Sequence, residues 1–131
     1  MNIKIDSENG VPIYLQVVKQ VKHLVAWGAL KSGDRLPPVR DLAMQLRINP
    51  NTVAKAYREL RYEKVINGRW GDGSFISQDV ARIAESEKKR MIAEAVDKAI
   101  HQGTNLGFSK EDLSKLFSDR LQGIGAKGQK K

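Results

Sequence analysis

The sequence predicts a mainly α-helical fold with a small β wing, in which a winged helix-turn-helix domain precedes a two-helix tail. Two short amphipathic helices joined by a tight turn are expected between residues 37 and 63. Two short strand-like runs with a turn dipeptide between them follow at once, at residues 65–76. Beyond residue 79, apolar residues recur at helical spacing in two further segments.

The N-terminal segment predicts a short extended stretch and a first helix. Ile3 and Ile5 alternate with polar residues, which is typical of a short strand or an extended arm. Pro12 suits the first turn of a helix, because its fixed φ fits there and its missing N–H is not needed. Apolar residues at helical spacing then continue as far as an expected end near Trp27-Gly28.

The helix-turn-helix is the most informative stretch. Pro37-Pro38 marks the start of its first helix, and Asn49 is a good N-cap for the second, with Pro50 in the first helical position. The second helix is expected to run from Pro50 to about Glu63. Its core side carries four residues at helical spacing, namely Val53, Ala56, Tyr57 and Leu60.

A β-hairpin is expected directly behind that helix, which makes it a wing. Its strands are predicted at residues 65–67 and 74–76, and Asp72-Gly73 is a favourable hairpin-turn dipeptide. Trp70, near the tip, is interpreted as a packing residue of the hairpin rather than as a wedge between base pairs.

The tail predicts two helices and a disordered end. The first helix runs from Val80 to about Gln102 and is expected to stop at Gly103. Ser109 and Asp112 resemble a capping box that opens the second. The expected domains are residues 1–78 for the winged helix, 79–122 for the tail and 123–131 for a disordered basic C-terminus.

Apolar rows on the tail helices predict dimerisation, because two isolated helices cannot bury both rows. Pairing with a second copy would cover them and would set two winged domains about one DNA turn (~34 Å) apart. The alternative is that the tail packs back on its own domain. The row residues are Met91, Ile92, Ala95, Val96, Ala99, Ile100, Leu113, Leu116, Phe117 and Leu121.

The charge favours a polyanionic partner. The chain carries a net charge of +8 with a pI near 9.8. Residues 1–78 hold 12 Lys and Arg against 7 Asp and Glu, a net charge of +5, whereas residues 79–122 hold 8 of each. The basic excess therefore lies on the expected winged domain and on the last nine residues.

Composition argues against several other classes of protein. The absence of cysteine excludes disulfides and zinc-thiolate sites. His23 and His101 are interpreted as surface residues, and no carboxylate pair or metal-ligand spacing is present, so no enzyme activity, metal or cofactor is expected. No apolar run approaches the ~20 residues that span a bilayer, and the N-terminus lacks the layout of a secretory signal. A cytoplasmic protein without a membrane partner is expected.

The second helix of the motif is the expected reader of DNA bases, because such a helix fits the major groove. Opposite its core side stand Asn51, Thr52, Lys55, Arg58 and Glu59. Asn can bond adenine, Thr can touch a thymine methyl group, and Lys can reach guanine or phosphate. The alternative is that these residues form only a solvated face.

Three further arginines are candidate DNA contacts outside this helix. Arg35 and Arg40 are expected near the start of the preceding helix, where they could reach the DNA backbone or a groove edge. Arg69 is expected near the wing tip, where it could enter the minor groove.

The order of these motifs resembles the GntR family of bacterial regulators. The resemblance rests on the segments Pro12–Gln16, Gly33–Pro37, Val39–Ala43, Asn49–Leu60 and Gly71–Ile76. It implies a homodimer on a two-fold-symmetric DNA operator. It also implies DNA contacts from Arg35, Arg40, Asn51, Thr52 and Lys55, and from the wing at Gly71 and Gly73.

The chain departs from the family pattern at the expected DNA surface. Pro38 stands where many members have Ser, and Pro50 and Ala54 stand where other branches have arginine. The base-reading scheme of those branches therefore does not transfer to this chain.

The short tail resembles the YtrA-type branch of the family. Members of that branch often repress neighbouring ABC-transporter genes. The tail is expected to be too small for a pocket of ~300 Å³ within one chain. Any small-molecule effector is therefore expected at the dimer interface.

The alternative function is a winged-helix protein-interaction module without sequence-specific DNA binding, because a fold does not dictate a function. Salt dependence distinguishes the two. Binding through several phosphates weakens steeply with salt, whereas an apolar protein interface does not.

Overall fold

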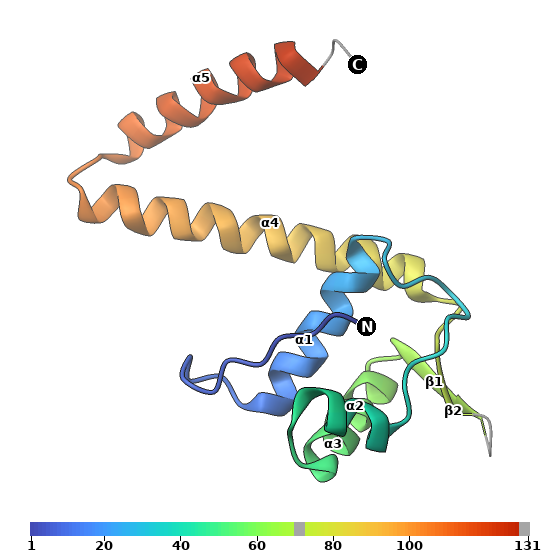
Figure 1. Cartoon of the computed structure of the whole chain (residues 1–131). Helices are drawn as coiled ribbons and strands as arrows, with labels where there is room; N and C mark the ends of the chain where they lie inside the picture. The colour runs from blue at the N-terminus through green and yellow to red at the C-terminus, as the bar shows by residue number, and fades with distance from the viewer. Residues whose placement is uncertain (70–72, 129–131) are drawn as a thin grey trace. The chain divides into compact units, whose positions relative to one another are not determined.

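A computed structural model describes residues 1–69 and 73–128, and it confirms a mainly helical chain with a two-stranded wing. The helices are α1 (Ile13–Ala26), α2 (Val39–Leu46), α3 (Pro50–Tyr62), α4 (Val80–Asn105) and α5 (Lys110–Gly128). The strands are β1 (Ile66–Arg69) and β2 (Gly73–Ile76). Figure 1 shows α2 and α3 side by side, with the hairpin following α3. By their contacts, the residues form two compact units, Met1–Lys89 and Arg90–Lys131.

The core of the first unit lies where α1, α3 and the wing meet. Val17 and Val21 of α1 are completely buried, as are Val53 and Leu60 of α3. Ile66 and Ile76 of the wing, which face each other across the antiparallel hairpin, close the same cluster. The core also takes in the start of α4, because Val80 is buried and Ile83 and Ala84 pack against the cluster.

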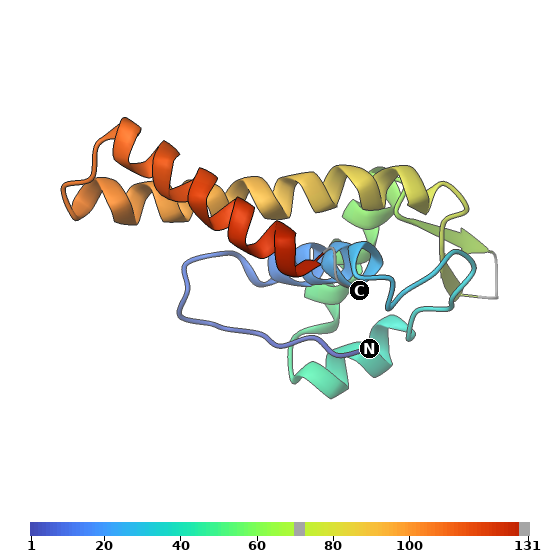
Figure 2. The ribbon, with the colours of Figure 1, turned by 90° about the horizontal axis from the view of Figure 1, so that it is seen from above.

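The N-terminal arm is extended and is held by side chains of α1. Residue Ile3 is buried in the core. The Lys4 amide N–H donates to Oε1 of Gln20 (2.9 Å), and Nε2 of Gln20 donates back to the Lys4 carbonyl oxygen. Of the two predicted forms, a strand or an extended arm, the structure has the arm. Figure 2 shows it looping round before α1 begins.

The C-terminal ends of α1, α2, α3 and α4 each form a Schellman motif. In this motif two backbone N–H groups just beyond the helix donate to two carbonyl oxygens of its last turn. After α1, Ala29 N–H donates to Leu24 and Gly28 N–H donates to Val25. A residue one or two positions beyond each helix adopts a left-handed φ, a conformation that glycine usually supplies. Gly28 (φ +79°) and Gly107 (φ +89°) supply it after α1 and α4, whereas Arg47 (φ 57°) and Lys64 (φ 64°) supply it after α2 and α3.

The predicted stop of α4 at Gly103 is wrong, because the helix continues to Asn105. Gly103 is instead a packing position, since a Cβ there would overlap the Leu113 side chain of α5. The helix ends at Asn105, and the chain then turns at Gly107, with Phe108 N–H donating to the Gly103 carbonyl oxygen (2.9 Å). From this turn the chain reverses direction into α5, which leads away at an angle to α4 (Figure 1).

The predicted disorder from Gly123 to Lys131 is also wrong for its first part, because α5 continues through Gly128. Glycine costs a helix ~1 kcal/mol per residue but does not end it, and no proline stands in this stretch. Residues 129–131 lie outside the described part of the chain. At the other end of α5 the capping box is present: Asp112 N–H donates to Ser109 Oγ (3.1 Å), and Ser109 N–H donates to Asp112 Oδ2 (3.0 Å).

Candidate nucleic-acid interface

The turn between α2 and α3 has the helix cap that its sequence predicts. Arg47 takes the left-handed conformation that ends α2. The side chain of Asn49 then caps α3, as its Oδ1 accepts a hydrogen bond from the Asn51 amide N–H (2.8 Å). Pro50 follows as the first helical residue. The predicted capping role of Asn49 and Pro50 is confirmed.

The two sides of α3 differ as the helical spacing predicts. Val53, Ala56, Tyr57 and Leu60 are at most 1% exposed. On the opposite side Asn51, Lys55 and Arg58 are exposed, and Thr52 is half-buried. The structure thus presents four hydrogen-bonding or charged side chains on one face of α3, most of them at its N-terminal half. That they contact DNA stays a prediction.

Tyr57 links α3 to the segment that precedes α2. Its hydroxyl donates a hydrogen bond to the Pro37 carbonyl oxygen at 2.6 Å. Burial raises the pKa of the Tyr57 phenol far above its ordinary value, because the phenolate would lose its hydration. The hydroxyl therefore stays protonated and joins α3 to the segment that leads into α2.

Arg35 lies beside the wing rather than at the start of α2, which corrects the position expected from sequence. The chain before α2 pairs with the outer edge of β2: Leu36 N–H donates to the Ser74 carbonyl oxygen (2.9 Å), and Ile76 N–H donates to that of Asp34 (2.8 Å). This pairing sets Arg35 opposite Phe75, with its guanidinium carbon 6.0 Å from the ring centroid. A positive charge thereby stands on the surface of the wing.

The remaining wing residues are described only in part. Gly73 begins β2 with a φ of +94°, and the Arg35 guanidinium passes close to it. The backbone of Arg69 ends β1, but its side chain, together with Trp70, Gly71 and Asp72, lies outside the described residues. The contact predicted for the wing tip therefore stays a prediction.

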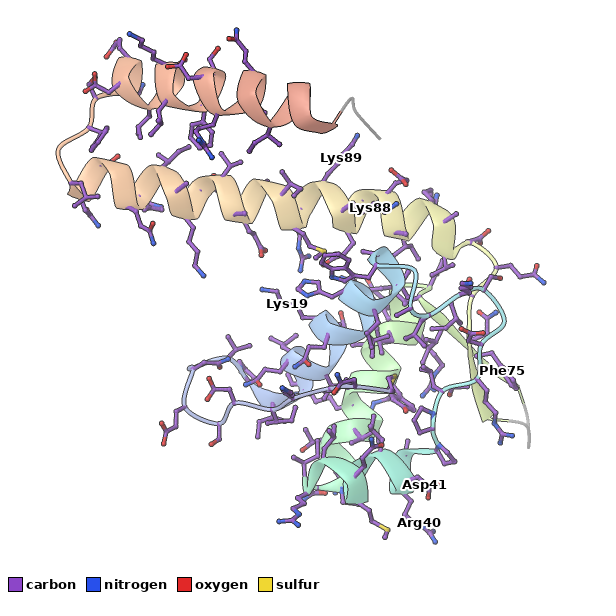
Figure 3. The ribbon with its side chains drawn as sticks, turned by 45° about the horizontal axis from the view of Figure 1, so that its top comes forward. Lys19, Arg40, Asp41, Phe75, Lys88 and Lys89 are labelled. Atoms are coloured by element: carbon purple, nitrogen blue, oxygen red, sulfur yellow. The ribbon has the colours of Figure 1, made fainter. Side chains whose placement is uncertain are left out.

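Arg40 occupies the first turn of α2 and is exposed. Figure 3 shows its side chain pointing away from the core, next to that of Asp41. Pro38 caps α2 without a side-chain hydrogen bond, in accordance with the loss of a hydroxyl at this position. Arg40, unlike Arg35, lies where the sequence places it.

Three contacts around α1 were not expected from the sequence. The Lys55 ammonium lies 4.2 Å from the ring centroid of Tyr14, a residue of the first turn of α1. Lys22 forms an ion pair with Glu63 at the end of α3. His23 Nε2 lies 3.5 Å from Oε1 of the buried Glu87 of α4, so His23, interpreted as a surface residue, is half-buried with 30% of its side chain exposed. Each pair joins two different elements. The sequence could predict on which side of its helix each residue lies, but not its partner on another element.

The apolar rows of the tail are only partly covered within the second unit: Met91, Ala99, Leu113 and Phe117 are half-buried, whereas Ala95 is exposed. Ile92 and Leu121 are 67% and 70% exposed, and Val96, Ile100 and Leu116 are also exposed. Between α4 and α5 lies a cavity of about 330 Å³, lined mainly by apolar side chains. The expectation that the tail of one chain is too small for such a volume is therefore wrong.

Other kinds of site find no support in the described residues. Nowhere in residues 1–69 and 73–128 do three or more His, Asp or Glu side chains gather as metal ligands would. Over the same residues, no helix combines the length and apolar character needed to cross a bilayer.

Comparisons with known proteins agree with this geometry. The model of a family described as bacterial regulatory proteins, gntR family, matches residues 13–76. The chain is 38% identical over 117 residues to the HTH-type transcriptional repressor YtrA of Bacillus subtilis, which covers 89% of this chain and 90% of the relative. The crystal structure of a transcriptional regulator from Oenococcus oeni has a TM-score of 0.73 at 39% identity, covering 92% of this chain and 97% of that one. YtrA from Sulfolobus acidocaldarius, a GntR-family transcription factor, has a TM-score of 0.57 at 36% identity, covering 76% and 97%.

Proposed function

Because this chain belongs to the GntR family of bacterial regulatory proteins, in its YtrA-type branch, we propose that it is a repressor that binds a two-fold-symmetric operator as a homodimer. The observation that carries the DNA-binding part is the exposed face of α3. Asn51, Thr52 and Lys55 stand there on a capped helix whose opposite side is locked into the core. These are side chains that pair with base edges in the major groove.

Phosphate contacts come from the flanks of α3 in this proposal. Arg40 approaches the backbone from the first turn of α2, and Arg35 and Arg69 approach from the wing. The net charge of +5 over residues 1–78 supports the same orientation, because phosphate contacts dominate affinity.

The dimer is supported by the exposed rows on α4 and α5. Burying a large aliphatic side chain such as Ile92 or Leu121 contributes about 1.5–3 kcal/mol, and within one chain this gain is not realised. A second copy has the same rows and would cover them isologously. We assign DNA binding to residues 1–78, dimerisation to 79–122 and no separate role to 123–131.

The proposed mode of regulation and target genes follow those of the YtrA-type branch. The curated relative of Bacillus subtilis is named a transcriptional repressor, and we propose the same action here, with neighbouring ABC-transporter genes as targets. A small-molecule effector would bind on the tail near the dimer interface, where the cavity between α4 and α5 opens. The protein would act in the cytoplasm, on the nucleoid when bound to DNA.

Selection of bound duplexes from a random pool at near-physiological salt tests the proposal. Recovery of a two-fold-symmetric motif is the expected result, because each copy would read one half-site. A single asymmetric half-site would contradict the dimer. Salt-sensitive binding without any motif would contradict sequence-specific regulation and favour the protein-interaction module.

A further inference from the structure

We propose that Tyr14 is a specificity-determining residue of this regulator, because its ring positions the Lys55 ammonium on the DNA-facing side of α3. The inference rests on the proposed function, in which Lys55 reads a base. It adds a residue of α1, outside the helix-turn-helix, to the machinery of recognition.

The contact itself is the first step. The Lys55 Nζ atom lies 4.2 Å from the centroid of the Tyr14 ring, well within the ~6 Å over which a cation is attracted to an aromatic face. The two residues belong to different helices, α1 and α3, which pack against each other in the first unit. Lys55 is exposed, so the ring is a fixed neighbour for an ammonium that otherwise stands in water.

The second step is that the ring has a defined place. Tyr14 is half-buried and packs against the core cluster. The turn before it is held by the buried side chain of Gln16: its Nε2 donates to the carbonyl oxygens of Asp6 (2.7 Å) and Val11 (2.9 Å), and its Oε1 accepts from the Asp6 amide N–H (2.9 Å). This clamp sets where α1 begins, and with it the position of Tyr14 in the first helical turn.

The third step is the effect of the Tyr14 contact on the conformational entropy of the Lys55 side chain. A lysine side chain is flexible and loses much rotamer freedom when it is ordered at an interface. The Tyr14 ring restricts the ammonium before DNA arrives, so less freedom is lost on binding. The ring also limits which base pair the ammonium can reach, and this converts a general phosphate-seeking charge into a positional one.

The test is a double-mutant cycle on the consensus duplex recovered by selection. Tyr14→Leu keeps an apolar side chain but removes the ring, and Lys55→Met removes the charge. Tyr14→Leu should weaken binding about two- to five-fold, because the Lys55 side chain would then be ordered only when DNA binds. In the Lys55→Met background the same change should have no further effect. Tyr14→Phe, which keeps the ring, should bind as the wild type does.

Specificity gives a readout that a merely structural role would not move. Tyr14→Leu and Lys55→Met should relax the preference at the same half-site base pair. Tyr62→Leu is the matched control, because this tyrosine at the end of α3 is 82% exposed, and it should leave that preference unchanged. In the free protein, the ring current of Tyr14 should shift the NMR resonances of the Lys55 ε-methylene protons, and Tyr14→Leu should abolish the shift.

Three outcomes would overturn the inference while leaving the proposed function intact. One is an equal loss of affinity from Tyr14→Leu with and without the Lys55 charge. Another is a loss from Tyr14→Phe as large as that from Tyr14→Leu, which would mean that the hydroxyl contacts DNA directly. The third is the absence of the ring-current shift. Failure of the wild-type protein to select any motif would instead contradict the proposed function itself.

Discussion

The guanidinium of Arg35 lies against the first residue of β2, Gly73, so closely that a Cβ at Gly73 would stand 3.2 Å from the Arg35 Nε atom. The glycine also has a φ of +94°, a conformation that L side chains rarely adopt. The position of a candidate DNA-binding arginine thus depends on a wing residue 38 positions further along the chain.

Gly73→Ala should both destabilise the fold and weaken DNA binding. The backbone conformation costs alanine about 1–2 kcal/mol, and the added methyl group requires the Arg35 guanidinium to shift by a few tenths of an ångström. Thermal unfolding and operator affinity measure the two effects. Gly28→Ala is the control, because Gly28 has a similar φ of +79° with nothing within 4 Å of an added Cβ. If Gly28→Ala weakens DNA binding equally, the effect comes from stability and not from Arg35.

Arg40→Ala should weaken binding to all DNA sequences alike. A side chain that neutralises one phosphate contributes about one to the slope of log affinity against log salt, so the variant should lower that slope by about one. Fluorescence anisotropy at several salt concentrations measures it. Met44→Ala on the same helix is the uncharged, exposed control. An unchanged slope for Arg40→Ala would mean that Arg40 does not contact phosphate.

Asn49 and Asn51 should separate stability from specificity. Asn49→Ala removes the cap of α3 and should cost about 1 kcal/mol of unfolding free energy, with the base preference kept. Asn51→Ala leaves the cap intact, since only the backbone N–H of Asn51 donates to it. It should relax one half-site position by about 1–3 kcal/mol if a bidentate contact is lost, and Thr52→Ala should do the same at its own position. Selection profiles of the variants and their urea unfolding curves measure these effects.

Charge on the apolar rows of the tail should dissociate the proposed homodimer. Ile92→Glu and Leu121→Glu each place a carboxylate on a surface that the second copy would bury, where an unpaired charge is costly. Analytical ultracentrifugation should show monomers, and affinity for the full operator should fall towards that for a half-site. Met44→Glu, an equally exposed apolar position on α2, should leave the dimer unchanged. Persistence of the dimer in both tail variants would place its interface elsewhere.

Tyr57→Phe should alter the dependence of stability on pH at the alkaline end. The folded-state pKa of Tyr57 is raised above the ordinary value of 10.0, so its stabilising effect is complete below pH 10. Above that pH it is lost, because the unfolded chain releases the phenolic proton and the folded chain does not. The free energy of unfolding, measured with urea, should therefore fall more steeply with rising pH for the wild type than for Tyr57→Phe. The difference in slope should be up to about 1.4 kcal/mol per pH unit. At pH 7 the variant should lose about 1 kcal/mol with the hydrogen bond to Pro37. Parallel curves for both proteins would contradict the assignment.

The elements of this fold could be predicted from the sequence because their determinants are local. Asn49-Pro50 starts α3, and the spacing of Val53, Ala56, Tyr57 and Leu60 defines which side of α3 is buried. The exposed residues Asn51 and Lys55 follow from the same helical period. Helix propensity predicted the wrong end for α4, because Gly103 is a position of close packing against Leu113 and not a helix stop.

Only the tertiary structure decided which of these side chains meet. Arg35 stands beside the wing because residues 33–36 pair with β2, and Tyr14 contacts Lys55 because α1 packs against α3. The hydroxyl of Tyr57 is occupied by Pro37, and His23 lies against Glu87. Helical periodicity and helix capping depend on residues three or four positions apart, so they can be recognised in the sequence. Contacts between distant residues depend on the angles at which elements pack, which are set by the whole core at once.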